Sequence, residues 1–478
     1  MQQIDYDSSK WASNPKARNL LHRITTFAIC FFLLTVSQLY YIKAVRAEST
    51  PRPNIVLILA DDLGYGDLGC FGQKYIKTPE LDRLCAEGLK MTSHYSGSTV
   101  CAPSRFTLVT GKHIGHAATI GQGQQLAPKT QTIGTVLQSA GYRTACIGKW
   151  GLGNQSGHPN KQGFDHWFGF ISQTRAHWYY PDYVWRNSQR VMMTDNPQTH
   201  ETYIHDKFTE ETLDFIRANR ERPFFVYLPY TIPHAEVLVP EDSQAPYIDK
   251  LGDPARPPIA EPYKMQGYNK PRYPRAARAG MISRMDRDIG RIRGLLEELK
   301  IAENTLIVFT SDNGPCSAGG QDIAFFESRG PLRGQKRTLY EGGLRVPTIA
   351  WWPGTIAKGS VNDFPSVFYD WLPTFAQFAG AKLNYPTDGV SLVPTLLGKT
   401  DEQTARKYIF WDYNEKGVSS RISAIRSGKW KMVVYRNKSP LKPELYDLSV
   451  DISEQNDLAK KHPELVEELL PLMKQWWR

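Results

Sequence analysis

The sequence predicts an α/β fold: a large, mostly parallel mixed sheet sandwiched by helices, with a smaller C-terminal α+β subdomain. Three segments each show an amphipathic helical pattern followed by a short apolar or aromatic run and a polar cluster. This alternation is typical of an open, largely parallel sheet covered on both faces. From about residue 400 the pattern changes to short antiparallel strand signals. We therefore expect a main domain at 50–395 and the subdomain at 396–478.

Residues 1–47 have the composition of a targeting segment. Four basic residues precede the apolar stretch "TFAICFFLLTVSQLYYI", and "VRA" at 45–47 places small residues where a signal peptidase would cut. The apolar stretch is also long enough to be an uncleaved membrane anchor. Under both interpretations the main domain is exported, so we expect a periplasmic or extracellular protein.

The first element of the main domain is the apolar run before Asp61, which we expect to be a strand. It leads into "DDLGYGDLG" at 61–69, whose glycines satisfy the dinucleotide-binding pattern G-x-G-x-x-G. That motif must enter a helix directly, whereas "CFGQKYIKTP" has no helical periodicity, and two carboxylates would repel a phosphate. Adjacent Asp61 and Asp62 are better explained as oxygen ligands of Ca²⁺ or Mg²⁺.

The three helix–strand units follow along the chain. In "TIGTVLQSAGYRTACIGKW" the helical pattern stops at Gly141 and the strand ends near Lys149. In "DKFTEETLDFIRAN" and "FFVYLPY" the strand runs into His234. In "MISRMDRDIGRIRGLLEELK" and "TLIVFTSDNG" the strand ends on Asp312 and Asn313.

Two further regions differ from this pattern. Residues 236–279 are rich in Pro, Tyr and Arg, and we expect them to form a long surface excursion. The C-terminal part contains the strand signals "YIFWDY", "ISAIRSGKWKMVVY" and "ELYDL", followed by the helical pattern "HPELVEELLPLMKQWW".

Charged and polar residues therefore follow four of the predicted strands. Ligands in open parallel sheets bind beyond the carboxyl ends of the strands, so these side chains should meet at one edge. Carboxylate and amide oxygens suit a hard divalent cation, and no His/Cys spacing suggests zinc. The residues are Asp61, Asp62, Lys149, His234, Asp312 and Asn313.

Net charge and cysteine content limit the classes of function and the disulfide pattern that the chain can have. The formal net charge is +10, of which the first 47 residues contribute +4 from six Lys/Arg and two Asp/Glu. No dense Lys/Arg tract is interleaved with aromatic residues, so we expect no nucleic-acid partner. Besides Cys30 in the leader, the chain has five cysteines without disulfide-framework spacing, so at least one is unpaired or modified. These are Cys70, Cys85, Cys101, Cys146 and Cys316.

The stretch "STVCAPSRFTLVTGKH" at 98–113 carries the most specific motif. Cys101, Pro103 and Arg105 match C-x-P-x-R, and in this the chain resembles the type I sulfatases of the alkaline phosphatase superfamily. A lone cysteine would otherwise be interpreted as a buried thiol or half of a disulfide. The resemblance extends from about residue 52 to the end, because "GKWGLG", "PH", "SDNG", "GQKRTLYEGGLRVP" and "ELYDLSVDISEQNDLA" follow in the family's order. It implies an alkaline phosphatase-like fold and an arylsulfatase-type sulfuric ester hydrolase.

The resemblance also implies the cofactors and the nucleophile. In the family the motif cysteine is oxidised to formylglycine during export, which implies a formylglycine-generating maturation enzyme as a partner. One Ca²⁺ per chain would be held by Asp61, Asp62, Asp312, Asn313 and the modified Cys101. Position 101 would lie at a helix N-terminus, which favours negative charge. One hydroxyl of the aldehyde hydrate would attack sulfur, and the second would collapse to the aldehyde and release sulfate.

Four further residues take roles by the same resemblance. Arg105 and Lys149 would orient and stabilise the hydrate and the sulfate, while His234 and Lys336 would neutralise or protonate the leaving oxygen. Each has a plain alternative, because an isolated histidine is often structural and most lysines are solvated surface residues.

The chain departs from the family at one position. Many members have a histidine two residues after the motif lysine, in G-K-W-H-L-G, where this chain has Gly151. That histidine is usually assigned to the sulfate-releasing half of the cycle. Its absence leaves the base of that step open, with His113 and His116 either as substitutes or as packing residues.

These observations predict an exported sulfatase acting on a sulfated carbohydrate or an aryl sulfate. Two alternatives stay open: a phosphodiesterase or phosphonate monoester hydrolase of the same superfamily, and an inactive sulfated-glycan-binding protein. The aromatic residues Trp178, Tyr179 and Tyr180 could stack on sugar rings or pack in the core.

Overall fold

The computed structural model describes residues 52–116, 125–254, 256, 268, 271–414 and 421–477, together with 15, 16 and 19. Apart from these three positions, the leader predicted at 1–47 lies outside the described residues, so its cleavage or anchoring stays a prediction. No helix in the described part of the chain is both long and apolar enough to cross a membrane. Residues 53–478 form one compact unit.

A mixed ten-stranded sheet forms the centre of this unit. Its strand order is β11-β2-β10-β9-β1-β8-β4-β5-β6-β7, and the five strands from β9 to β5 run parallel. Antiparallel pairs occur only towards the two edges, so the predicted mostly parallel mixed sheet is confirmed. The strands are β1 (Asn54–Ala60), β2 (Leu89–Met91), β4 (Arg143–Lys149), β5 (His166–Phe170), β6 (Tyr183–Arg186), β7 (Gln189–Met192), β8 (Phe224–Pro229), β9 (Thr305–Ser311), β10 (Thr348–Trp351) and β11 (Ser360–Asn362).

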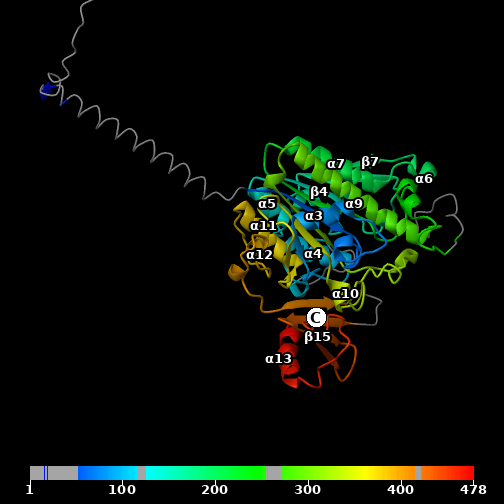
Figure 1. The fold of residues 1–478 in the computed structure, drawn as a ribbon, viewed down its shortest axis with the longest axis vertical. Coiled ribbons are helices and arrows are strands. Elements are labelled where there is room, and N and C mark those ends of the chain that lie inside the picture. The colour runs from blue at the N-terminus through cyan, green and yellow to red at the C-terminus, as the bar shows by residue number, and fades with distance from the viewer. Residues whose placement is uncertain are drawn as a thin grey trace, which may run out of the picture. The chain divides into compact units, whose positions relative to one another are not determined.

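Helices cover both faces of the sheet because successive strand side chains point to opposite faces. In β1, Val56 and Ile58 belong to one buried apolar cluster, whereas Leu57 and Leu59 belong to the other. Each fully buried aliphatic side chain of this kind contributes about 1.5–3 kcal/mol of hydrophobic stabilisation. Helices α3 (Pro79–Glu87), α7 (Ile204–Asn219) and α9 (Pro274–Glu298) cover the first face, and α4 (Cys101–Thr110), α5 (Ile133–Ser139), α11 (Trp371–Ala379) and α12 (Val393–Leu396) cover the second (Figure 1).

The three predicted helix–strand units are present, with one correction. Helix α9 begins at Pro274, so the surface excursion predicted at 236–279 is wrong for its last six residues. Proline is well placed at the first helical position, where its missing N–H has no intrahelical partner. The glycine-rich loop after β1 enters only the short 3-10 helix η1 (Gly69–Phe71), and the next helix starts at Pro79, which agrees with the exclusion of a dinucleotide loop.

Shorter elements complete the described part of the fold. They are β3 (His94–Tyr95), β12 (Ser366–Val367), α6 (Asn196–Thr199), α8 (Glu241–Gln244), α10 (Glu341–Leu344), and the 3-10 helices η2 (Ile114–His116), η3 (Pro159–Gln162), η4 (Arg175–His177), η5 (Ala245–Tyr247), η6 (Ala302–Asn304), η7 (Ala318–Gly320), η8 (Phe368–Asp370) and η9 (Thr400–Glu402). The five cysteines from Cys70 to Cys316 are free thiols.

The C-terminal part is an antiparallel sheet with one helix, as predicted. Strands β13 (Ile409–Tyr413), β14 (Ile422–Ser427), β15 (Trp430–Tyr435) and β16 (Pro443–Asp447) pair in chain order, and α13 (Pro463–Lys474) packs on one face (Figure 1). The other face packs against the residues around α10. There the buried Lys431 pairs with Glu341 at 2.8 Å and with Glu454 at 2.9 Å.

Candidate active site

Four neighbouring parallel strands end at one edge of the sheet, and their following residues form the candidate site. Strands β9, β1, β8 and β4 are adjacent in that order, so their carboxyl ends lie side by side. Ion pairs and hydrogen bonds connect the residues predicted from the strand ends with Arg105 of α4 and with Lys336. The structure thus brings together Asp61, Asp62, Arg105, Lys149, His234, Asp312, Asn313 and Lys336.

Oxygen atoms of three residues in this cluster lack hydrogen-bond partners. The backbone N–H of Asp62 donates to Asp312 Oδ1 at 3.1 Å, and Asn313 Nδ2 donates to Asp62 Oδ1 at 2.7 Å. Asp61 Oδ1, Asp62 Oδ2 and Asn313 Oδ1 are nevertheless buried without a hydrogen-bond partner among the described residues. An unsatisfied buried polar atom costs about 1–3 kcal/mol. Three such oxygens from adjacent strand ends fit a hard divalent cation, as predicted for these residues.

The backbone at Asp62 is itself unusual. Its φ is +66°, in the left-handed region, which costs roughly 1–2 kcal/mol for a residue other than glycine. Aspartate tolerates this conformation better than most residues. Strain of this kind is often found at functional sites, and here it occurs directly after β1 within the oxygen cluster.

Three buried cations balance the three carboxylates. Arg105 Nη2 lies 2.8 Å from Asp312 Oδ2, Lys149 Nζ lies 2.6 Å from Asp61 Oδ2, and Lys336 Nζ lies 2.6 Å from Asp62 Oδ1. All six side chains are buried. When the three carboxylates are all ionised, their charge of −3 is balanced by the +3 of the three cations. A bound divalent cation would leave the site with a charge of +2, which suits an anionic substrate.

The pKa values of the carboxylates reflect these neighbours. Burial opposes ionisation of Asp61, but Lys149, His234 and Arg105 outweigh it and hold its pKa well below the usual range. Burial and the charge of Asp61 raise the pKa of Asp312 to about 7, and a divalent cation beside it would favour the charged form. Burial and Lys336 lower the pKa of His234, whose Nε2 lies 3.4 Å from Asp62 Oδ2.

Cys101 is the first residue of α4, so its backbone lies at the positive end of the helix dipole. Its side chain is partly exposed, whereas Ala102 and residues 104–110 are buried. Lys149 and Lys336 both interact electrostatically with Cys101. The Sγ atom lies 3.9 Å from Oε1 of Gln173, a residue that no motif singled out.

The structure adds His177, which the sequence patterns missed, and gives Tyr179 a contact with the site. The ring of His177 stacks on the ring of His234, with centroids 4.1 Å apart and an interplanar angle of 11°, and its Nε2 is buried without a hydrogen-bond partner in the described part of the chain. The hydroxyl of Tyr179 contacts the backbone oxygens of Thr231 at 2.9 Å and His234 at 2.5 Å. Tyr179 is fully buried, which agrees with the packing alternative for this residue and excludes sugar stacking.

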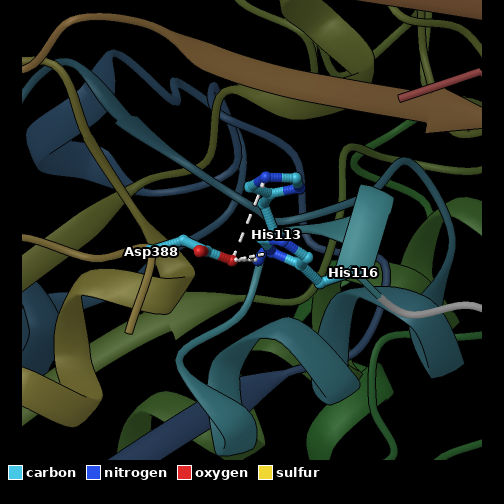
Figure 2. Close-up of side chains that lie close together, drawn as sticks. All are labelled: His113, His116 and Asp388. Carbon is cyan, nitrogen blue, oxygen red and sulfur yellow. Dashed lines mark hydrogen bonds and ion pairs between the residues drawn. The ribbon is translucent and has the colours of Figure 1, made fainter. Parts of the chain in front are cut away.

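His113 and His116 lie away from this cluster. Both follow the C-terminal end of α4, whose ten residues span about 15 Å, whereas Cys101 begins the helix. Asp388 Oδ2 contacts Nδ1 of His116 at 2.6 Å and accepts from the backbone N–H of His113 at 2.8 Å (Figure 2). The geometry therefore does not support either histidine as a substitute for a side chain at position 151.

This second cluster is better explained as structural than as a metal site, although its ligand atoms lie within 4.8 Å of one another. The backbone N–H of Gly115 donates to Nδ1 of His113 at 3.0 Å. Neutral His113 therefore carries its proton on Nε2, the atom that faces Asp388, and has no lone pair there for a metal. Trp476 packs edge-on against both histidine rings at 4.5 and 4.7 Å.

Comparisons with known proteins agree with the fold and identify the family. Residues 53–381 match the family model described as Sulfatase, and residues 334–476 match the model described as N-sulphoglucosamine sulphohydrolase, C-terminal. The chain is 35% identical over 382 residues to the N-acetylgalactosamine-6-sulfatase of Canis lupus familiaris, covering 74% of this chain and 67% of that one. It is 31% identical over 516 residues to the N-acetylgalactosamine-6-O-sulfatase of Bacteroides thetaiotaomicron, covering 90% and 94%. The crystal structure of Ps i-CgsB in complex with k-i-k-neocarrahexaose has a TM-score of 0.75 and 29% identity, covering 89% of this chain and 92% of that one.

Proposed function

We propose that this chain, which belongs to the sulfatase family, hydrolyses sulfate esters of a carbohydrate with a formylglycine formed from Cys101 and a bound Ca²⁺. Family membership establishes a sulfuric ester hydrolase. One observation carries the finer proposal. The three buried oxygens without a hydrogen-bond partner belong to the same cluster as three buried cations, and one of these cations, Arg105, lies in α4, the helix that Cys101 begins.

The residues present fit the proposed metal and the proposed nucleophile. Asp61, Asp62, Asp312 and Asn313 would hold the cation, together with the converted side chain of residue 101. The cation would supply Lewis-acid stabilisation of charge on a sulfate oxygen. The aldehyde hydrate would supply one hydroxyl that attacks sulfur and a second that lets sulfate leave.

The chain's own cations account for the rest of the chemistry. Lys149 and Arg105 hold the carboxylates in place and give the site the positive field that a sulfate group needs. Burial opposes the charge on Lys336, but Asp62 outweighs this and raises its pKa well above the usual value, so the group stays an ammonium. We assign Lys336 to neutralising the leaving oxygen as its bond to sulfur breaks. His234, predicted for the same role, has a lowered pKa, so we assign its uncharged ring to hydrogen bonding beside that oxygen.

The substrate class follows from the relatives. Two of them are named as sulfatases of N-acetylgalactosamine 6-sulfate, at 35% and 31% identity. We therefore take a sugar 6-sulfate, with N-acetylgalactosamine 6-sulfate first, as the substrate class. Export through the N-terminal segment and a formylglycine-generating maturation enzyme belong to the same proposal.

A mass measurement tests the nucleophile first. The tryptic peptide 91–105, from protein exported by its native host, should show Cys101 with one sulfur and two hydrogens lost and one oxygen gained. The same protein should release sulfate from N-acetylgalactosamine 6-sulfate, the Cys101→Ala variant should not, and the matched Cys70→Ala variant should. An unmodified Cys101 with no sulfate release, but with binding of the sulfated sugar, would favour the inactive binding protein instead.

A further inference from the structure

The space beside Gly151 is filled by another side chain. A Cβ atom built on Gly151 would lie 1.9 Å from Nε2 and 2.7 Å from Cδ of Gln173, so the side-chain amide of Gln173 would have to move away from its present position. The amide Nε2 donates to the backbone oxygen of Gly151 at 3.3 Å. The backbone of Gly151 has a φ of +76°, which also favours glycine. Gly151 and Gln173 are therefore a matched pair, in which the absent side chain leaves room for the amide.

The other end of the same amide group points to the nucleophile position. Oε1 of Gln173 accepts from Sγ of Cys101 at 3.9 Å, which is within the range of a hydrogen bond to sulfur. A single side chain thus joins the strand end after β4 to the first residue of α4. The side chain of Gln173 is half-buried, so solvent reaches its surroundings.

We propose that Gln173 is a positioning residue for the group at position 101, in the place that a side chain at 151 would otherwise take. The inference rests on the proposed function, because it concerns the second hydroxyl of the aldehyde hydrate. Oε1 accepts a hydrogen bond from that hydroxyl and holds it apart from the attacking one. Sulfate release then requires that the hydroxyl loses its proton, that its C–O bond becomes the C=O bond, and that the bond from carbon to the sulfate oxygen breaks.

Gln173 orients this hydroxyl but does not accept its proton. An amide oxygen is a hydrogen-bond acceptor and is not a base at ordinary pH. His113 and His116 lie at the other end of α4 and do not take this proton. Solvent water reaches the half-buried amide, and in this proposal water is the acceptor. An active enzyme is then consistent with the absence of a base at position 151, because Gln173 orients the second hydroxyl and water accepts its proton during sulfate release.

Paired substitutions test the occupancy of the space without any need for the modified residue. Gly151→Ala and Gln173→Ala are made singly and together in a Cys101→Ala background, and thermal unfolding midpoints are measured. Gly151→Ala introduces the same left-handed backbone strain whether residue 173 is Gln or Ala, so the two pairs of proteins differ only in the clash with Gln173. We expect Gly151→Ala to lower the midpoint more when Gln173 is present than when it is absent. Equal losses in both backgrounds would overturn the pairing.

The positioning role is tested by separating the two halves of the reaction. We expect Gln173→Ala to lower kcat about tenfold, the effect of one hydrogen bond, with KM nearly unchanged. The fraction of peptide 91–105 that carries a sulfate during turnover should rise, as measured by mass spectrometry. Gln173→Glu keeps an acceptor oxygen and should retain more activity than Gln173→Ala. Gln189→Ala, at an exposed position of β7, is the matched control.

The outcomes separate the inference from the proposed function. A wild-type kcat and sulfated fraction in Gln173→Ala would overturn the positioning role, and so would a rise in KM alone. An unmodified Cys101 in the wild-type protein would refute the formylglycine mechanism and the positioning role with it, while the unfolding experiment would still decide whether Gln173 fills the space at Gly151.

Discussion

Acid should destabilise the protein through His94, a fully buried histidine in β3. Trp371 Nε1 donates to His94 Nε2 at 3.2 Å, so the proton of the neutral ring lies on Nδ1, which contacts Ser366 Oγ at 2.8 Å. Burial, with a smaller contribution from Arg406, lowers the pKa of His94 from 6.5 to about 3. Protonation of the folded protein would place a charge in the core and break the bond from Trp371.

The pKa of His94 differs between the folded and the unfolded chain, and this difference makes the free energy of unfolding depend on pH. The unfolded chain takes up a proton near pH 6.5 and the folded chain only near pH 3, so stability is complete above pH 6.5 and is lost as the pH falls through this window. Each pH unit in the window costs about 1.4 kcal/mol. Between pH 7 and pH 4 the loss due to His94 is therefore about 3 kcal/mol.

Urea unfolding at pH 7, 6, 5 and 4 measures this loss against a His94→Gln variant. Glutamine is neutral throughout and can accept from Trp371 and donate to Ser366. All other titrating groups are common to both proteins, so their contributions cancel in the difference. We expect the wild-type protein to lose about 3 kcal/mol more than the variant by pH 4. An equal pH dependence of the two proteins would refute the buried-neutral assignment of His94.

Three further predictions concern the site and its support. Lys431→Met removes the buried cation of Glu341 and Glu454 and should cost about 3–5 kcal/mol in the free energy of unfolding, measured in urea; a loss below 1 kcal/mol would contradict it. Tyr179→Phe should lower kcat with little change in KM, because the hydroxyl that contacts the backbone oxygen of His234 is gone; wild-type kcat would show that this contact is dispensable. A chelator should abolish sulfate release but leave the circular dichroism spectrum intact, because three buried cations balance the charge of the three carboxylates after the metal has left. Added Ca²⁺ should restore activity. Unfolding of the protein by the chelator would contradict this charge balance.

Much of the fold could be predicted because its central strands are regular. The apolar runs that end before Asp61, Asp312 and His234 lie in adjacent parallel strands, and the helices between them have clear amphipathic patterns. The edge strand β11 and its neighbour β2 could not be predicted, because they have three residues each and carry no periodic signal. The start of α9 was missed because "PRYPRAARAG" has the composition of a loop, and its one helical signal was Pro274 at the first position.

The residues of the candidate active site also fall into two groups, those that could be predicted from the sequence and those that could not. Residues that follow strands or lie in family motifs could be found from the sequence, and the structure brings them together. Gln173 and His177 follow no motif, and their contacts with Cys101 and His234 depend on how the segment after β5 folds back over the sheet edge. The only signal for Gln173 was indirect: the glycine at 151, where the resemblance to the sulfatase motif led us to expect a histidine.

The C-terminal sheet has a consequence for how this enzyme can be shortened. Leu339 and Leu344, just after Lys336, pack in one apolar cluster with Trp411 and Val433 of that sheet. A protease that removed the chain beyond 395 would expose one side of the segment that carries Lys336, because that segment packs against the C-terminal sheet. It would also remove Lys431, the ion-pair partner of Glu341. Loss of the C-terminal sheet, which contributes no residue to the candidate active site, would then lower kcat. The boundary at 395 marks a change of sequence pattern, and we do not expect a smaller working enzyme on either side of it.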